Sequence, residues 1–218
     1  VVPTGNFGDI LAGDFARRMG LPVAKLICAS NANNVLTAFI RTGLYDRRRA
    51  FHKTASPSMD ILVSSNLERY LYLESGRDAA LVARLMRELA EKGAYTAPEG
   101  VRKALSERFW AGCADDTDTF RIIARVWHEL GYLLDTHTAV AWSVYERFSQ
   151  QDDNGKKTVV LATASPYKFA ASVLAALGSS PAPGFAALDE LNALTGVPVP
   201  KNLAAIRDLP VLHTDAVD

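Results

Sequence analysis

Residues 1–43 alternate between two patterns of hydrophobic and polar positions. Short apolar runs at residues 1–2 (VV) and 22–29 (PVAKLICA) have the character of strands. Each run is followed by a stretch in which apolar residues recur three and four positions apart, at residues 11–19 and 31–42. That spacing is typical of one face of an amphipathic helix. The order strand, helix, strand, helix predicts a parallel sheet with helical crossovers, and we therefore expect an α/β fold.

The first predicted helix carries Leu11, Phe15 and Met19 on one face, at a spacing of four residues. Gly20 and Pro22 should end this helix, because a glycine at a helix C-terminus followed closely by proline is a common stop signal. The helix then fills the interval between the two predicted strands, where a parallel sheet needs its crossover.

The middle of the chain is predicted to be mostly helical. Residues 115–118 (DDTD) form an acidic, cap-like stretch ahead of one of these helices. The helical stretches, each with apolar residues three and four positions apart, are 64–74, 78–92, 98–109, 119–130 and 138–148.

The last third of the chain returns to mixed structure. Residues 152–155 (DDNG) predict a turn, and residues 158–163 (TVVLAT) are the clearest candidate for a buried strand, since they are rich in β-branched and aliphatic side chains. A helix through Phe169 and Val173 should follow. Beyond residue 181 we expect two short helices and a proline-punctuated tail that packs across the body of the protein.

Composition narrows the class of protein. The chain has 218 residues, 49% apolar and 22% charged, which fits one domain or slightly more. Its formal net charge is zero, so we expect neither nucleic acid nor an anionic membrane as partner. Cys28 and Cys113 form no metal or redox spacing, and no apolar run is long enough to span a bilayer. We expect a cytoplasmic protein that holds no metal.

The first cluster with chemical potential is the sequence PTGNFGD, residues 3–9. Gly5 and Gly8 allow a tight turn with exposed N–H groups at a helix start, where the helix dipole favours an anion such as a phosphate monoester. The motif lacks the Gly-Lys-Ser/Thr ending of a Walker loop and the G-x-G-x-x-G spacing of a dinucleotide-binding loop. A purely structural turn between strand and helix is the alternative.

The second cluster follows the predicted strand at residues 158–163. Thr163 should present its hydroxyl at the carboxyl end of the sheet, where open α/β sheets bind their ligands. A hydroxyl both donates and accepts, so it could meet a heterocyclic ring nitrogen without charging it. The alternative is a threonine whose hydroxyl binds its own backbone.

In combination, several stretches resemble the threonine synthase family. The similarity runs nearly the whole length of the chain, in the family's order, and is weakest at residues 76–118. The matching stretches are 1–43, 56–61 (SPSMDI) with 64–69 (SSNLER), 135–140 (DTHTAV), 159–169 (VVLATASPYKF) and 198–209. The resemblance implies a pyridoxal phosphate (PLP) enzyme of fold type II, the fold of tryptophan synthase β.

The resemblance also implies roles for particular residues. The backbone of Gly5, Asn6, Phe7 and Gly8 would hold the cofactor phosphate, and Thr163 would face the pyridine nitrogen. A neutral partner at that nitrogen would leave it largely unprotonated, which restrains the cofactor as an electron sink. For the substrate phosphate the contributors would be Lys168 and Arg69.

The implied reaction converts O-phosphohomoserine and water into threonine and phosphate. A PLP enzyme holds its cofactor through a Schiff-base lysine, which in this family lies upstream of the phosphate loop, and Lys25 and Lys53 have no matching context. The chain opens on Val1-Val2-Pro3, as if within a strand. We therefore expect residues 1–218 to be the C-terminal part of a longer enzyme, cut just before the phosphate loop and inactive alone.

Two alternatives to threonine synthase stay open at this point. One is a threonine-synthase-like phospholyase or a dehydratase that releases 2-oxobutyrate, and the other is a catalytically silent PLP- or phosphate-binding module. We expect any self-association to be a homodimer, and a dimer through a sheet edge that the missing half leaves open to exist only in the shorter chain. His137, within the third matching stretch, fits a structural histidine as well as a functional one.

Overall fold

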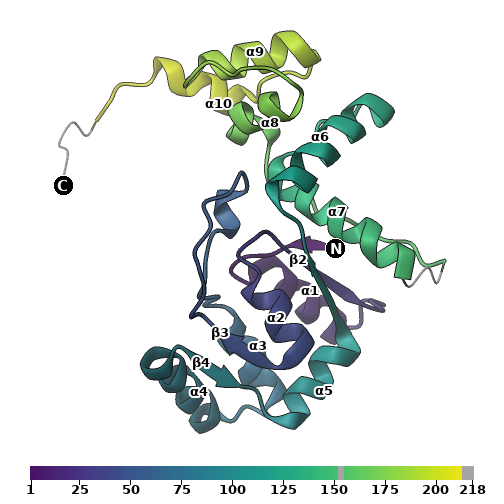
Figure 1. Cartoon of the computed structure of the whole chain (residues 1–218), viewed down its shortest axis with the longest axis vertical. Helices are drawn as coiled ribbons and strands as arrows, with labels where there is room; N and C mark the ends of the chain where they lie inside the picture. Colours follow the sequence, from purple (N-terminus) through teal and green to yellow (C-terminus); the bar gives the residue numbers. More distant parts are fainter. Residues whose placement is uncertain (152–154, 213–218) are drawn as a thin grey trace.

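The computed structural model describes residues 1–151 and 155–212 (Figure 1). Three strands, β1 (Val2–Pro3), β2 (Leu26–Ser30) and β5 (Phe109–Cys113), form a parallel sheet in the order β1-β2-β5. Val2 pairs with Cys28, and Cys28 pairs with Ala111. The predicted α/β class and the parallel sheet are confirmed.

Both faces of this sheet are covered, as is usual for parallel sheets. Leu26 and Cys28 of β2 lie in a core shared with the α/β helices, whereas Ile27 and Ala29 point to the opposite face, against α7. The helices of the α/β part are α1 (Gly8–Arg18), α2 (Val35–Thr42), α3 (Leu67–Glu74), α4 (Ala79–Lys92) and α5 (Glu99–Arg108). The helices predicted at 31–42, 64–74, 78–92 and 98–109 are thus confirmed, with boundaries that differ by a few residues.

Strand β5 was not foreseen, because residue 109 was assigned to the end of a helix. Helix α5 instead ends at Arg108, and the backbone of Phe109 is extended. Phe109 packs into the α/β core, while Trp110 contacts the α7 side. Gly112 lets α7 approach the sheet, since a Cβ there would lie 3.1 Å from Val144 Cγ1. A five-residue strand with two small residues has too little apolar character to be recognised.

Helix α1 buries a different face from the one predicted. Leu11 is buried, but Phe15 is 42% exposed and Met19 is 88% exposed. The inward position is Asp14, which is fully buried because Arg17 and Arg18 both hydrogen-bond its carboxylate. A hydropathy pattern scores an aspartate as outward-facing, so it could not anticipate this arrangement.

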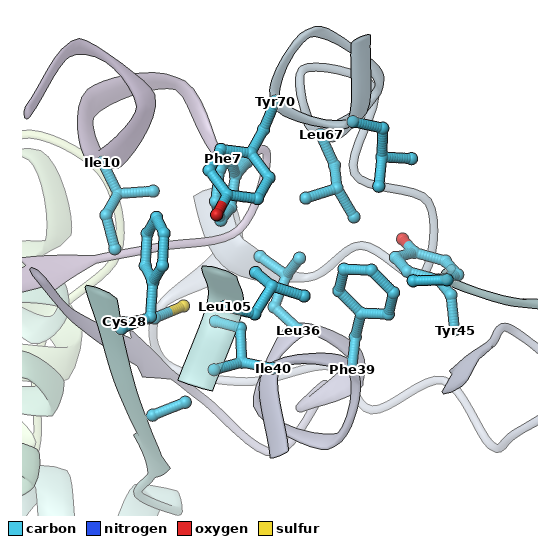
Figure 2. Close-up of a cluster of buried hydrophobic side chains, with 14 of the residues drawn as sticks. Phe7, Ile10, Cys28, Leu36, Phe39, Ile40, Tyr45, Leu67, Tyr70 and Leu105 are labelled. Atoms are coloured by element: carbon cyan, nitrogen blue, oxygen red, sulfur yellow. The ribbon is translucent and has the colours of Figure 1, made fainter. Parts of the chain in front are cut away.

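A short two-stranded antiparallel sheet also escaped the sequence pattern. Strands β3 (Leu44–Asp46) and β4 (Ala94–Thr96) pair with each other, and the rings of Tyr45 and Tyr95 stack at 5.2 Å with an interplanar angle of 3°. Tyr45 marks one end of the α/β core in Figure 2. Each strand has only three residues, too few for a period-two pattern to register.

The second part of the molecule is helical. Its helices are α6 (Asp116–Leu130), α7 (Thr136–Gln151), α8 (Ala170–Ala176), α9 (Ala186–Thr195) and α10 (Lys201–Ala205). The cap predicted at 115–118 is confirmed, since the Asp115 side chain accepts the Asp118 N–H at 2.8 Å. A separate core joins α6, α8 and α9, and Figure 1 shows α8 to α10 gathered at one end of the molecule, away from the sheet.

Two predictions for the last third were wrong. Residues 158–163 form no strand and are mostly exposed, with Val159 at 70%. Among the described residues, their only sheet-like contacts are with Val1. Its N-terminal nitrogen donates to Val159 O (2.7 Å), and its carbonyl accepts from Leu161 N–H (3.0 Å). One residue cannot sustain a ladder. The tail does not pack across the body either, because Val211 and Leu212 are each 79% exposed.

Short 3₁₀ helices complete the described part of the chain: η1 (Pro57–Met59), η2 (Pro166–Phe169) and η3 (Ile206–Asp208). The turn predicted at 152–155 lies outside the described residues except for Gly155, which has a positive φ. No helix within the described ranges has the length and apolar character needed to cross a membrane.

Candidate anion-binding site

The loop between β1 and α1 presents a consecutive row of free backbone donors. Among the residues that the structure describes, none accepts a hydrogen bond from the N–H groups of Gly5, Asn6, Phe7, Gly8 or Asp9. The first N–H of α1 that is satisfied belongs to Leu11, which donates to Phe7 O at 3.3 Å. Unpaired N–H groups at a helix start attract anions, and phosphate is a common guest of such sites.

Phe7 gives the loop its shape. Its backbone is left-handed (φ 59°, ψ 21°), a conformation that a bulky residue adopts only when its surroundings impose it. The side chain is fully buried and contacts the rings of Tyr70 and Phe109, with centroids 5.9 and 5.8 Å away. Figure 2 shows the Phe7 ring pointing into the core beside Tyr70. This anchor offsets the backbone strain and turns consecutive N–H groups outward.

The two glycines serve other purposes than the turn itself, which corrects the expectation that they supply the tight conformation. Neither Gly5 nor Gly8 has a positive φ. A Cβ on Gly5 would lie 2.8 Å from Met59 Cα, so glycine is needed there for close contact between two backbone segments. A Cβ on Gly8 would meet only Asn66 Nδ2, at 3.7 Å, and Gly8 is exposed. The outer side of Gly8 is therefore open to a ligand.

Residues 65 and 66 fix the orientation of the loop. Asn6 Oδ1 accepts from the Ser65 N–H (2.6 Å) and hydroxyl (2.9 Å), and Asn6 O accepts from Asn66 Nδ2 (2.9 Å). With its carbonyl occupied in this way, Asn6 offers its N–H rather than its C=O to a ligand. The Asn66 amide also accepts from Arg69 Nη1 at 3.0 Å. Arg69 is thereby held next to the loop, with its side chain 57% exposed.

A second segment closes the other side of the loop. The turn η1 contacts Gly5 through Ser58 O and Met59, at 3.2 and 2.8 Å from the position of a Gly5 Cβ. Its base is held at Asp60, whose carboxylate accepts from Asn31, Asn33 and Thr54 at 2.7–3.0 Å. These side chains tie the turn to the carboxyl end of β2, the edge at which ligands bind in open parallel sheets.

His137 connects this turn to α7. Its Nε2 accepts from the Ser58 N–H at 3.2 Å, and its Nδ1 lies 3.1 Å from Asp135 Oδ1. Burial alone would raise the pKa of Asp135, but hydrogen bonds from His137 and Thr138 outweigh it and hold the pKa below its usual value. The His137 ring also packs on Phe169, with centroids 4.6 Å apart. His137 therefore has structural partners on every side.

Thr163 follows a segment that is held beside Val1 much less firmly than the loop. The hydrogen bonds around Val1 place Val160 opposite Val1, and among the described residues no hydrogen bond continues this pairing beyond Leu161. Thr163 is exposed, and its hydroxyl binds neither its own backbone nor any other described residue. It is free to face a ligand.

The remaining candidates are only loosely tied to the loop. Lys168 is exposed, with its ammonium 5.7 Å from the centre of the Phe169 ring. It connects to the loop indirectly, through Phe169 and His137. Arg69 also lines an apolar groove of about 610 Å³ together with Phe15 and Tyr72. The structure thus groups Gly5 to Gly8 with Arg69, leaves the Thr163 hydroxyl unpaired among the described residues, and links Lys168 to the loop through Phe169 and His137.

Sequence reasoning missed the residues that support the loop. Ser65, Asn66 and Ser58 lie in stretches that were noted only for their resemblance, because serine and asparagine in loops carry no periodic signal. Asp135 was missed as the partner of a histidine. The one available signal is Asp135-Thr136-His137, since an aspartate two residues before a histidine can reach its imidazole near a helix start.

These residues suit a phosphate ester attached to a polar ring. A row of N–H groups has no acceptor among the described residues, Gly8 leaves room beside it, and the exposed Thr163 hydroxyl is unpaired within the described part of the chain. Burial raises the pKa of the Cys28 thiol to about 12, so that cysteine is no nucleophile at neutral pH. Within the described part of the chain, no three His, Cys, Asp or Glu side chains are grouped so as to hold a metal ion.

Comparison with known proteins finds similarity to threonine synthases and to threonine synthase-like proteins. A family model described as "Threonine synthase, C-terminal" matches residues 138–210. The chain is 38% identical to threonine synthase of Corynebacterium glutamicum, over 98% of this chain and 42% of that protein. It is 41% identical to threonine synthase-like 1 of Homo sapiens, over 81% of this chain and 23% of that protein.

Solved structures agree with these relatives. A PLP-bound threonine synthase from Brucella melitensis superposes with a TM-score of 0.77 and 42% identity, over 88% of this chain and 40% of that one. Threonine synthase from yeast gives a TM-score of 0.82 and 34% identity, over 96% of this chain and 42% of that one. The chain therefore spans less than half the length of each of these proteins.

Proposed function

This chain belongs to the threonine synthase family, and from that premise we propose that the polypeptide containing it converts O-phospho-L-homoserine and water into L-threonine and phosphate, with PLP as cofactor. The observation that carries the proposal is the loop from Gly5 to Gly8, whose backbone N–H groups have no acceptor within the described residues. The cofactor of the Brucella melitensis relative carries a phosphate that such a loop suits.

In this proposal the loop holds the cofactor phosphate through backbone donors alone. The N–H groups of Gly5, Asn6, Phe7 and Gly8 donate to the phosphate oxygens, and the dipole of α1 favours the anion. Phe7 keeps the donors aligned by anchoring the loop in the core. Because the donors are ordered before the ligand arrives, binding loses little conformational entropy in the loop.

Thr163 is proposed to meet the other end of the cofactor. Its hydroxyl is exposed and unpaired among the described residues, which leaves it able to donate a hydrogen bond to the pyridine nitrogen. When bound, PLP supplies a ring that withdraws electrons from the carbons next to the substrate amino group. A neutral hydroxyl at the nitrogen leaves it largely unprotonated and moderates that withdrawal.

Arg69 and Lys168 are proposed to bind the phosphate that leaves the substrate. Both cations are partly or fully exposed, so each is accessible to a phosphate ester. Arg69 is the better placed of the two, because Asn66 holds it next to the Gly5–Gly8 loop. Lys168 reaches the site only through the contacts of Phe169 and His137.

We further propose that this chain is the C-terminal part of the enzyme and that the Schiff-base lysine lies in residues upstream of the phosphate loop. The chain spans 42% of the length of the Corynebacterium glutamicum relative, which leaves room for that lysine elsewhere. On this proposal residues 1–218 alone turn over no substrate, and the intact polypeptide acts in the cytoplasm.

The decisive experiment incubates the intact polypeptide with PLP and O-phosphohomoserine and quantifies threonine and inorganic phosphate together. Equal amounts of both products are expected. Phosphate with 2-oxobutyrate and no threonine would overturn the proposal in favour of a phospholyase, and no turnover at all would favour a silent binding module. Residues 1–218 alone serve as the control, and turnover by that control would refute an upstream lysine.

The phospholyase remains the second candidate function. The relatives named threonine synthase-like 1 are compatible with it, at 41–42% identity, just as the threonine synthase of Brucella melitensis, at 42%, is compatible with the first candidate. A phospholyase would use the same phosphate loop, so the loop alone does not distinguish the two reactions. Product analysis does.

A homodimer is also part of the proposal, and one that pairs through residues 158–163 should form only in the shorter chain. That segment is exposed and extended, and edges of this kind tend to pair with other strands. Light scattering on residues 1–218 and on the intact polypeptide tests it. A dimer of the shorter chain alone would show that the pairing arises only when the edge is uncovered.

A further inference from the structure

The protonation state of His137 follows from the partners of its two ring nitrogens, with Thr136 Oγ1 also 3.4 Å from Nδ1. The Ser58 amide can only donate, so His137 Nε2, 3.2 Å away, must carry a lone pair. The imidazole proton therefore lies on Nδ1, where it donates to Asp135 Oδ1 at 3.1 Å. The ring is 3% exposed, so water does not offer a substitute partner. His137 is neutral in the arrangement described.

Ser58 is also the point at which this network touches the phosphate loop. The Ser58 carbonyl and Met59 Cα lie 3.2 and 2.8 Å from the position that a Cβ would take on Gly5. The same peptide segment is thus held by His137 on one side and packs against Gly5 on the other. A shift of this turn changes the space available to the loop, and with it the alignment of the loop's N–H groups.

We propose that His137 is a positioning residue for the phosphate site: while neutral it holds η1 against Gly5, and on gaining a proton it releases η1 and weakens phosphate binding. This inference rests on the proposed function, because it concerns how the same loop is kept ready for its ligand. Histidine is the side chain suited to such a role, because its imidazole exists in both a neutral and a charged form.

The groups around His137 decide which contact breaks. Asp135 accepts from Nδ1 whether or not the ring is charged, so that contact survives protonation. At Nε2 a new proton would face the Ser58 N–H, and two donors repel each other. Other charges near the turn are Asp116, which accepts from Ala55 N, and Lys168, which lies over the Phe169 ring. Neither supplies Nε2 with an acceptor.

Asp60 completes the set of charged groups near the turn. Its carboxylate accepts from Thr54 N at 2.8 Å and from Asn31 at 2.7 Å, and neither contact involves His137. It anchors the base of η1 irrespective of the state of the imidazole. Protonation should therefore free residues 57–59 locally and leave the rest of the segment in place.

The test uses the intact polypeptide and compares wild type with His137→Gln and His137→Phe. Glutamine offers a carbonyl to Ser58 that does not titrate, whereas phenylalanine offers no acceptor. PLP dissociation constants are measured at pH 8 and pH 5.5 by absorbance. The PLP phosphate also titrates near pH 6, so every protein shares that change, and the difference between wild type and H137Q isolates His137.

Wild type should lose about 10-fold more affinity for PLP on acidification than H137Q, and H137F should bind weakly at both pH values. A matched His128→Gln change, at an exposed histidine of α6, should behave like wild type. Equal losses in wild type and H137Q would overturn the positioning role. At pH 8, H137Q must also bind PLP with an affinity within about 3-fold of wild type, unlike H137F.

A second measurement needs neither cofactor nor variant. Hydrogen exchange of the Ser58 amide in the unliganded intact polypeptide, corrected for the intrinsic pH dependence of exchange, should lose protection between pH 8 and pH 5.5. Constant protection would refute the release. If protection is lost but PLP fails to bind at any pH, the release is supported and the proposed function fails, so the two failures are distinguishable.

Discussion

The loop at residues 4–9 and the segment at residues 158–163 adjoin the same strand, β1, and are held in opposite ways. Phe7 ties the loop into the core, residues 65 and 66 bind Asn6, and η1 packs on Gly5. The segment 158–163 has two hydrogen bonds to Val1 and is mostly exposed. The phosphate end of the proposed site is therefore built by contacts within this chain, whereas the ring end is not.

The strongest way to break this contrast is to remove the anchor of the loop. Phe7→Ala should lower the free energy of unfolding of the intact polypeptide by about 3–5 kcal/mol, because it empties a fully buried aromatic position and leaves the left-handed backbone unsupported. Urea denaturation measures this. Phe51→Ala, at a side chain that is 59% exposed, should change it by less than ~0.5 kcal/mol. Similar losses in both variants would mean that Phe7 is no anchor.

The two glycines of the loop offer a matched pair. Gly5→Ala should cost about 1–3 kcal/mol and reduce PLP affinity, since its methyl group would press on the backbone of Met59. Gly8→Ala should leave the free energy of unfolding unchanged or slightly higher. The space around Gly8 is unoccupied, and Gly8 is the first residue of α1, where alanine restricts the unfolded chain more than glycine does. Thermal unfolding of the two variants compares them directly. Equal destabilisation would show that the loop is not packed as described.

The hydrogen bonds that connect α7 to η1 through Asp135 and His137 can be tested by measuring stability as a function of pH. Asp135→Asn should destabilise the protein by about 1–3 kcal/mol at pH 7, since charge-assisted hydrogen bonds to His137 and Thr138 are weakened. The folded-state pKa of Asp135 lies below the unfolded value, so its stabilising effect is fully present above about pH 4 and is lost as the pH falls through the folded pKa. The free energies of unfolding of wild type and D135N should therefore become equal in acid.

The comparison of wild type with D135N is made by measuring their urea denaturation midpoints at a series of pH values from pH 7 downward. Asp78→Asn is a suitable control, because Asp78 caps α4 by accepting from Leu81 N and asparagine caps equally well. A difference between wild type and D135N that persists unchanged into acid would contradict the assigned role of Asp135.

The smallest effect on stability is expected at the weakly held segment. Thr163→Val should change the free energy of unfolding by less than ~0.5 kcal/mol, because the hydroxyl is exposed and unpaired within the described residues. PLP affinity should nevertheless fall about 5- to 10-fold, the value of one hydrogen bond to the ring. Thr158→Val, at the opposite end of the segment, should affect neither quantity. Identical cofactor affinity in both variants would remove Thr163 from the site.

Sequence patterns predicted the parts of the fold whose signals are local and repetitive. The parallel order of β1 and β2 and the helices of the middle third followed from hydrophobic spacing and from caps such as Asp115. The loop at residues 4–9 was also identified, because glycines beside a helix start are a readable signal. Its left-handed residue was not, since Phe7 adopts that conformation only through its contacts with Tyr70 and Phe109.

The misses share a physical cause, which is that tertiary contacts overrode local preference. Residues 158–163 have the composition of a buried strand but lack a partner strand longer than Val1, so they remain extended and exposed. Asp14 is buried where an apolar residue was expected, because two arginines neutralise it. Strand β5 is short and contains Gly112, so only its pairing with β2 reveals it.

A receptor made of main-chain donors has a particular consequence for mutational scanning. Replacing Asn6 or Asp9 by alanine deletes a side chain but leaves every N–H of the loop in place, so an alanine scan would rank these positions by their packing and overlook the ligand. Exchanging single peptide bonds for esters by chemical ligation removes one donor at a time without touching the side chains. Ester substitution between Gly5 and Gly8 would trace the outline of the bound anion that side-chain genetics cannot see.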